Sequence, residues 1–245
     1  MLGYNWLIME RKTVKLQGFN VDTFTFEEAL EYITEKHGQV VTINPEMIQY
    51  AQKNQDFANI LENADMVIPD GIGVEIGLKI LGYHVRRIPG VEFARKLIDK
   101  FSEKSLPIAF VGAKPEIVEK AVLNVHKENP DMNVCYVQDG YFKDDERVLK
   151  ELGESGAKLV LVALGSPKQE FFIKRAKELL PDAVLIGIGG SFDVWSGVVK
   201  RAPVIYQKLG LEWLYRTVKE PQRIKRIFPT LPLFVLNVIK EKFGA

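Results

Sequence analysis

The chain has 245 residues, of which 47% are hydrophobic and 27% are charged, and 33 basic residues against 32 acidic ones leave a net charge of +1. These proportions are typical of a folded globular protein and exclude a disordered chain, a collagen-like repeat and a disulfide scaffold. The near-neutral total gives no reason to expect nucleic-acid binding. The single cysteine, Cys135, indicates a reducing compartment.

The chain begins with nine residues that do not have the pattern of a secretory signal, because they contain no basic residue and no small-residue cleavage site. A short strand or hairpin is expected over residues 17–22. The segment Thr25-Phe-Glu-Glu28 then matches a capping box and predicts a helix that runs to about Lys36.

From there the sequence alternates apolar strands with helical segments. The strands are continuously apolar, which is typical of parallel strands that helices cover on both faces. The predicted strands span residues 40–43, 66–68, 108–111, 133–137, 159–163 and 183–187, and the predicted helices span 46–62, 73–81, 91–102, 115–128, 146–154 and 168–180. This order predicts an α/β fold, doubly wound and Rossmann-like, with a largely parallel sheet.

The C-terminal segment differs from the rest of the chain in charge. Residues 197–245 carry a net charge of +7, which leaves −6 for residues 1–196. We therefore expect an α/β core over 1–196 and a basic, apolar appendage over 197–245 that meets something anionic. The most apolar stretch, residues 227–239, is shorter than the roughly 20 residues that cross a bilayer. It could lie in the membrane interface or pack on the core as a helix.

Glycines and polar residues gather in the turns that follow the strands. Ligands of such sheets bind at the carboxyl ends of the strands, and glycines let backbone N–H groups approach an anion there. These turns, over residues 42–46, 69–73, 112–115, 139–142, 165–170 and 187–193, predict a nucleotide or sugar-phosphate ligand. Gly187-Ile-Gly-Gly190 lacks the GxGxxG spacing and no GxxxxGK[ST] motif is present, which disfavours NAD and P-loop nucleotides.

Asp70 is the candidate general base. It follows an apolar strand and precedes Gly-Ile-Gly, so it would be exposed at the sheet edge and could take a proton from an attacking hydroxyl. The alternative is an N-cap on the next helix. Thr42 and Asn44 leave the neighbouring turn, where they could hydrogen-bond a sugar or serve the turn before Pro45.

No metal site is expected, because the three histidines lie far apart without HExxH spacing and no Asp-x-Asp motif is present. Cationic side chains would then have to neutralise a departing diphosphate. The appendage supplies Arg216, Arg223 and Arg226, of which the last two share a helix face by their spacing. Guanidinium groups bind diphosphate oxygens bidentately. The alternative role for these arginines is attraction to anionic lipid.

In their order along the chain, these turns resemble the WecG/TagA/CpsF family of bacterial glycosyltransferases. The resemblance runs from about Val14 to the C-terminus and is greatest to the TagA branch, which makes the linkage unit of wall teichoic acid. The matching segments span residues 42–47, 64–73, 140–142, 165–170, 187–190 with Phe192 and Asp193, 201–203, 211–216 and 220–223.

The resemblance implies an inverting transfer of N-acetylmannosamine from its UDP donor to N-acetylglucosamine on undecaprenyl diphosphate, without a cofactor or an obligatory metal. The enzyme would be cytoplasmic and peripheral on the inner face of the cell membrane, with the appendage docked on the anionic surface. The implied site has Asp70 as general base beside Thr42 and Asn44, donor-site residues Gln169, Gly187, Gly189, Gly190 and Asp193, Tyr141 near the uracil, and the three arginines completing it.

Three alternatives remain open at this point. A transferase for UDP-N-acetylmannosaminuronic acid would keep the family and change the donor. A dinucleotide-dependent oxidoreductase fits the α/β pattern but not the glycine spacing. A non-catalytic nucleotide-binding module would need no Asp70. The sequence also leaves a homo-oligomer open.

Overall fold

The computed structural model of the protein describes residues 10–203, 205–206, 210–219 and 224–244. Its centre is a sheet of six strands in which every neighbouring pair is parallel. In order across the sheet, the strands are β4 (Met66–Pro69), β3 (Gly38–Ile43), β8 (Val184–Gly187), β7 (Leu159–Ala163), β5 (Pro107–Gly112) and β6 (Asn133–Gln138). The predicted α/β, Rossmann-like architecture is confirmed.

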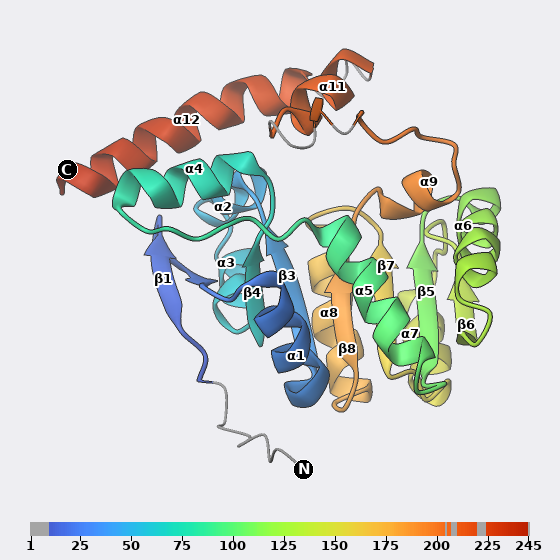
Figure 1. The fold of residues 1–245 in the computed structure, drawn as a ribbon. Coiled ribbons are helices and arrows are strands. Elements are labelled where there is room, and N and C mark those ends of the chain that lie inside the picture. Colours follow the sequence, from blue (N-terminus) through green and yellow to red (C-terminus); the bar gives the residue numbers. More distant parts are fainter. Residues whose placement is uncertain (1–9, 204, 207–209, 220–223, 245) are drawn as a thin grey trace, which may run out of the picture.

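Helices cover both faces of this sheet (Figure 1), which explains why its strands are continuously apolar. In β7, Leu159 and Leu161 pack toward one face, whereas Val160 and Val162 pack toward the other. The first face is covered by α1 (Phe26–Lys36), α5 (Gly90–Ser102), α6 (Pro115–Glu128) and α9 (Ser191–Trp195). The second is covered by α2 (Pro45–Ala51), α3 (Gln55–Glu62), α7 (Asp145–Glu154) and α8 (Lys168–Leu179).

A separate antiparallel hairpin precedes the sheet. It consists of β1 (Thr13–Leu16) and β2 (Phe19–Asp22), so the predicted segment 17–22 contains its turn and its second strand. Gln17 and Gly18 both have positive φ, as a tight two-residue hairpin turn requires. The carboxylate of Asp22 accepts a hydrogen bond from the Val67 N–H at 2.6 Å, which ties the hairpin to β4.

The single helix predicted over residues 46–62 is wrong, because two helices occupy this segment. Asn44 caps α2 and Asn54 caps α3, each through a side-chain oxygen that accepts a backbone N–H three residues later. The backbone of Asn54 is extended, which interrupts the helix at that residue. Capping by Asn is a local side-chain effect, and the apolar spacing of the segment does not reveal it.

The C-terminal segment forms α11 (Glu212–Lys219) and α12 (Ile224–Phe243), and α12 lies along α4 (Ile72–Leu81) at the edge of the body (Figure 1). Phe234 and Val238 of α12 are fully buried in one core cluster with the hairpin and with α2, α3 and α4. A Cβ at Gly77 would lie 3.0 Å from Phe234 Cζ, so a glycine at this position lets α12 approach α4 closely.

The opposite side of α12 faces outward. Phe228 is 76% exposed and Leu236 is 56% exposed. The segment 227–239 therefore packs on the core along one side, as one of its two sequence interpretations requires, and keeps a second, apolar side uncovered. No helix in the described part of the chain is both long enough and apolar enough to span a membrane. The boundary between residues 196 and 197 remains a prediction.

We expect Phe234→Ala to lower the free energy of unfolding by about 3–5 kcal/mol, because it opens a cavity between α12 and the core. The control is Phe228→Ala on the exposed side of the same helix, for which we expect a change within about 0.5 kcal/mol. Denaturant titration of both variants measures the difference. Equal effects of the two substitutions would contradict the docking of α12.

Candidate active site

The turns that the sequence analysis singled out all lie at one edge of the sheet, because parallel strands end on the same side. Asp70 follows β4, Thr42 is in β3, Gly187 ends β8, Gly165 follows β7, Gly112 ends β5 and Tyr141 follows β6. With a strand spacing of about 4.8 Å, the outermost of these strands are roughly 24 Å apart. Figure 1 shows this edge facing the C-terminal segment. We call it the catalytic edge.

Asp70, Thr42 and the start of α5 converge at one end of the catalytic edge. The Ile88 N–H donates to the Pro69 carbonyl at 2.7 Å, which brings the start of α5 back to the end of β4. A Cβ on Gly90 would lie 2.9 Å from Thr42 Cγ2 and 3.5 Å from Asp70 Oδ2. The positive end of the α5 dipole therefore lies beside the Asp70 carboxylate.

Asp70 is not the N-cap of the following helix, which was the alternative interpretation of this residue. The N-cap of α4 is Gly71, which has no side chain that could cap the helix. Asp70 is half-buried, and its N–H donates to the Ile43 carbonyl at 2.8 Å. Its backbone is therefore held to β3, while its carboxylate lies at the catalytic edge beside Gly90.

Thr42 and Asn44 both serve the turn after β3. The Thr42 hydroxyl is buried and donates to the Gly187 carbonyl at 3.1 Å, which joins β3 to the end of β8. The Asn44 side-chain oxygen accepts the Met47 N–H at 3.1 Å as the N-cap of α2. Both contacts leave hydrogen-bonding capacity that a ligand could use, namely the Thr42 oxygen as an acceptor and the Asn44 amide group as a donor.

The Gln169 side chain packs against the loop that contains Gly187, Gly189 and Gly190 and holds its backbone in place. This side chain is buried, its oxygen accepts the Gly189 N–H at 3.1 Å, and its nitrogen donates to Glu170 at 2.8 Å. A Cβ at Gly187 would lie only 2.5 Å from the Gln169 nitrogen, so a side chain at this position would displace Gln169. A direct contact between Gln169 and a donor remains a prediction. A Cβ at Gly190 would lie 3.6 Å from the Asp193 carboxylate, so these two donor-site candidates are adjacent.

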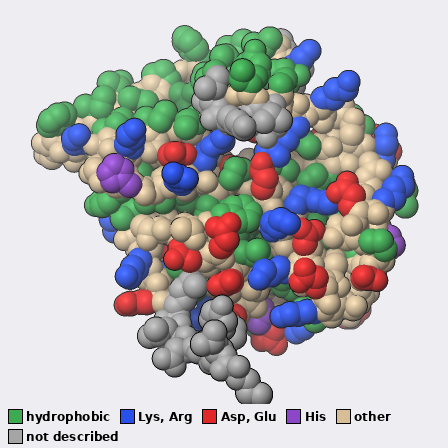
Figure 2. Space-filling model, in the orientation of Figure 1, with side chains coloured by type: hydrophobic (Ala, Val, Ile, Leu, Met, Phe, Trp, Pro, Cys, Tyr) green, Lys and Arg blue, Asp and Glu red, His purple; other side chains and the backbone are tan. Residues whose placement is uncertain are grey.

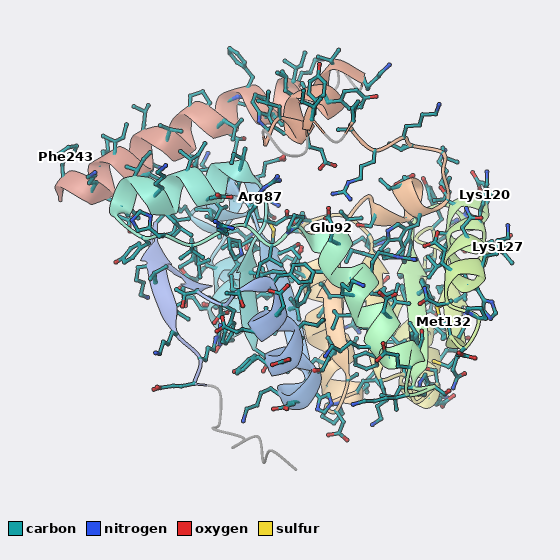
Figure 3. The ribbon with its side chains drawn as sticks, in the orientation of Figure 1. Arg87, Glu92, Lys120, Lys127, Met132 and Phe243 are labelled. Carbon is teal, nitrogen blue, oxygen red and sulfur yellow. The ribbon has the colours of Figure 1, made fainter. Side chains whose placement is uncertain are left out.

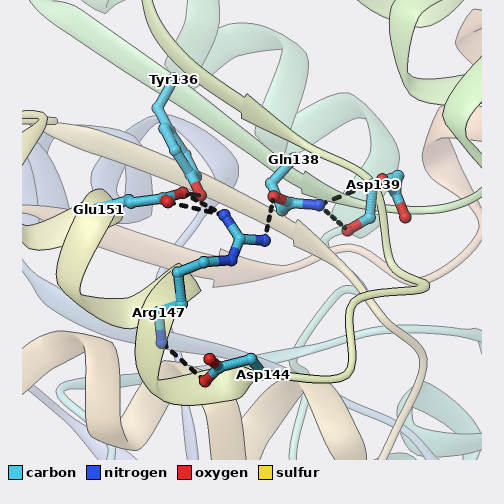
Figure 4. A network of polar contacts seen from close by, with 6 residues as sticks. All are labelled: Tyr136, Gln138, Asp139, Asp144, Arg147 and Glu151. Atoms are coloured by element: carbon cyan, nitrogen blue, oxygen red, sulfur yellow. Dashed lines mark hydrogen bonds and ion pairs between the residues drawn. The ribbon is translucent and has the colours of Figure 1, made fainter.

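Tyr141 lies at the other end of the catalytic edge on a loop held by a polar network (Figure 4). Its N–H donates to Asp139 at 2.7 Å, and Gln138 donates to the same carboxylate at 3.1 Å. Arg147 donates to Gln138 at 3.4 Å and to Glu151 at 2.7 Å, which ties the loop to α7. The Tyr141 side chain is 67% exposed, so the network presents its ring outward on an anchored loop.

The structure does not describe the side chains of the three predicted arginines. Arg223 and the nine N-terminal residues lie outside the described residues, and Arg216 and Arg226 belong to α11 and α12 without described side chains. Their roles therefore remain predictions. Within the described ranges, no group of three or more His, Cys, Asp or Glu side chains is arranged to hold a metal ion.

The structure adds charged residues at the catalytic edge that the sequence analysis did not consider. Figure 3 places Arg87 and Glu92 where the body faces the C-terminal segment. Arg87 directly precedes Ile88, and its guanidinium lies 3.9 Å from Glu75 of α4. In the sequence, the two consecutive arginines just before Ile-Pro-Gly90 were the signal that could have indicated a cation at this edge. Arg201, which begins the segment 201–203 named in the sequence analysis, pairs with Glu92.

A cavity of about 570 Å³ adjoins the catalytic edge between α5, α6 and α9. Val91, Glu92, Trp195 and Arg201 are among the residues that line it, whereas Asp70 and the glycine loops are not. Since Val91 directly follows Gly90, the cavity begins beside the Asp70 end of the edge. It does not itself define the site of a nucleotide.

Glu170, the neighbour of Gln169, is only 2% exposed, and burial raises the pKa of its carboxyl above the ordinary value of 4.5 more than hydrogen bonds from Gln169 and Ser166 lower it. A raised pKa means that the folded state loses stability as the pH rises from that ordinary value through the raised one. We expect Glu170→Gln, which keeps the oxygen acceptor for Gln169, to remove this loss. Its gain in melting temperature over the wild type should therefore be larger at about pH 8 than at about pH 5.

Thermal melts at both pH values check this expectation, with Glu119→Gln on the exposed side of α6 as the control. The control should show a similar small difference at each pH. A constant or shrinking gain for Glu170→Gln between the two pH values would contradict a burial penalty on the ionised carboxylate.

Comparison with known proteins identifies the family of this chain. The chain matches the model of the Glycosyl transferase WecG/TagA/CpsF family over residues 14–245. Two relatives are each named N-acetylglucosaminyldiphosphoundecaprenol N-acetyl-beta-D-mannosaminyltransferase. The protein of Bacillus spizizenii is 38% identical over 213 residues, which cover 86% of this chain and 82% of the relative. That of Bacillus subtilis is 37% identical over 227 residues, which cover 91% and 88%. The chain therefore belongs to the WecG/TagA/CpsF family of glycosyltransferases.

Proposed function

We propose that this glycosyltransferase moves N-acetylmannosamine from UDP-N-acetylmannosamine to N-acetylglucosamine on undecaprenyl diphosphate, in the synthesis of the wall teichoic acid linkage unit. The observation that carries the proposal is the convergence of Asp70, Thr42 and the start of α5 at one end of a glycine-lined edge. The names of the two relatives support the choice of the transferred sugar and of the acceptor.

The order of groups along the catalytic edge suggests how the donor lies. The sugar would be at the Asp70 end, the diphosphate over the loop formed by Gly187, Gly189 and Gly190, and the uracil near the exposed Tyr141 ring. The start of α9 would attract the anion there, since the Gly189 N–H already donates to Gln169. Gln169 would hold the backbone of this loop through the Gly189 N–H. Asp193, which is adjacent to Gly190, would hydrogen-bond the donor.

In the proposed reaction, Asp70 takes the proton from an acceptor hydroxyl while the oxygen attacks the anomeric carbon from the side opposite the diphosphate. A new C–O bond forms, the bond between the anomeric carbon and the diphosphate oxygen breaks, and the configuration inverts. Negative charge then develops on the departing UDP. Arg87 and the appendage residues Arg216, Arg223 and Arg226 would stabilise this charge, so the reaction would need no metal.

The appendage would bring the site to the membrane that holds the acceptor. Figure 2 shows hydrophobic side chains gathered over α11 and α12, on the side away from the body. The exposed ones are Trp213, Leu214, Val218, Ile224, Phe228, Leu233, Val235, Leu236, Ile239 and Phe243, and exposed basic residues on the same two helices are Lys219, Lys225, Lys240 and Lys242. We call this surface the apolar tail face. Apolar residues mixed with lysines suit the inner face of a membrane rich in anionic lipid.

The proposed function is tested by measuring UDP release with purified protein, a polyprenyl-diphosphate-linked N-acetylglucosamine and several UDP-sugars. Acceptor-dependent release from UDP-N-acetylmannosamine would support it. Preference for UDP-N-acetylmannosaminuronic acid would overturn the choice of donor within the family. Thermal stabilisation by NAD but not by UDP, without any release, would instead favour the dinucleotide-dependent oxidoreductase, which family membership argues against.

We expect Asp70→Asn to lower turnover by about 10²–10⁴-fold, because the amide cannot accept the proton of the attacking hydroxyl. The dissociation constant for UDP should change little, since the substitution is isosteric and lies at the sugar end of the edge. UDP release and UDP binding measure the two effects separately. A wild-type rate would exclude Asp70 as the base.

We expect Phe228→Glu to weaken binding to vesicles that contain phosphatidylglycerol at least about tenfold, because burying a phenylalanine contributes roughly 1.5–3 kcal/mol. Leu123→Glu is the matched control, since Leu123 is also an exposed apolar residue but lies on α6. Vesicle sedimentation measures both variants. Equal losses for the two, or none for Phe228→Glu, would contradict docking through the apolar tail face.

A further inference from the structure

Arg201 connects the body of the protein to the appendage through two carboxylates. It pairs with Glu92 in the first turn of α5, and its Nη2 lies 3.7 Å from the Glu212 carboxylate at the start of α11. The three side chains are partly buried, with exposed fractions of 26% for Arg201, 38% for Glu92 and 17% for Glu212. The contact joins residues that are 109 positions apart in the chain, so it is a tertiary link and not a feature of one helix.

This link lies close to the proposed base. Glu92 is two residues after Gly90, whose position is packed against Thr42 and against Asp70 Oδ2. Glu212 is the first residue of α11, and Arg216 follows it one helical turn later. Arg201 therefore holds the first turn of α5, beside Asp70, to the first turn of the helix that carries Arg216.

A second contact, independent of charge, brings the same segment to the same place. A Cβ at Gly210, two residues before α11, would lie 2.7 Å from Ile72 Cγ1. Ile72 begins α4 and is separated from Asp70 by Gly71 alone. The start of α11 is thus held against the first residue of α4 and against the first turn of α5, on two elements that flank Asp70.

The arrangement of these three charged groups is poorly suited to a role in which they only stabilise the fold. One guanidinium faces two carboxylates, and both the Arg201 Nε and one Glu92 oxygen are buried without a hydrogen-bond partner among the described residues. Partly satisfied ion pairs contribute little net stability, but they can select one orientation over others. A guanidinium suits this task because its planar fork fixes the direction of both partners.

From these contacts we infer that Arg201 is a positioning residue for the transferase reaction. By binding Glu92 and Glu212 at once, it sets the start of α11 over the catalytic edge, so that the arginines of the appendage reach the departing diphosphate. The inference rests on the proposed function for its effect on turnover. Its structural part, the placement of α11, can be measured without the reaction.

The test compares Arg201→Gln with the wild type in turnover, UDP binding and hydrogen exchange. We expect kcat to fall at least about tenfold, because the appendage arginines then reach the departing diphosphate less often, and UDP, which carries the same diphosphate, should bind more weakly. Amide exchange in α11 should become faster. Exchange in α12 should not change, because Phe234 and Val238 hold that helix independently. Arg201→Lys, which keeps the charge but loses the fork, should recover part of the kcat.

Three further variants separate positioning from a general loss of an ion pair. Arg175→Gln removes an arginine–glutamate pair between α8 and α7 and should leave kcat and α11 exchange unchanged. Glu212→Gln should resemble Arg201→Gln, and the double variant should be no worse than either single one, since both remove the same link. Gly210→Ala changes no charge but forces the segment away from Ile72, and it should also lower kcat.

Unchanged exchange in α11 together with wild-type kcat for Arg201→Gln would overturn the inference. Faster exchange throughout the protein would also overturn it, because the pair would then act on global stability. If the wild type shows no acceptor-dependent UDP release, the proposed function fails, while the exchange of α11 still decides whether Arg201 places this helix.

Discussion

Parallel pairing of the six strands is the constraint on which the rest of this structure depends. A parallel strand must be followed by a crossover, so each strand ends at the same edge and each helix begins there. Residues from six separate parts of the sequence, from Thr42 to Gly187, are brought to one line in this way. The backbone hydrogen bonds of Asp70 to β3 and of Ile88 to the end of β4 keep the Asp70 end of that line in place.

Several polar side chains at this edge fix the conformation of the loops around them. Asn44 caps α2, Thr42 joins two strands, and Gln169 holds the loop around Gly189 from a buried position. Such residues are costly to bury unless their hydrogen bonds are satisfied, which is why each has a specific backbone partner. A site built on such contacts is ordered before a ligand arrives, and preorganisation of this kind strengthens electrostatic stabilisation of developing charge.

Helix α12 of the appendage has one side that is buried in the core and another that is apolar and exposed. Phe234 and Val238 are buried against α4 and the hairpin, whereas Phe228 and Leu236 on the other side are exposed. The buried side makes α12 part of the folded body, and the exposed side leaves an apolar surface next to the catalytic edge. In our proposal, docking of the exposed side of α12 on the membrane also brings the appendage arginines to the catalytic edge. The reason is that α11, which carries Arg216, lies between that apolar surface and the edge. The Arg201 link would then decide the angle at which α11 meets the edge.

The amino-acid sequence by itself determined the elements whose signals are local. Continuous apolar runs predicted all six strands of the parallel sheet, the capping box at Thr25 predicted the start of α1, and the order of motifs predicted the family. Tertiary structure alone decided that Asp70 lies against Gly90, that Gln169 lies beneath the glycine loop, and that Arg201 joins Glu92 to Glu212. The physical reason is that periodicity and capping act over a few residues, whereas these contacts join positions that only the packed sheet and its crossovers bring together.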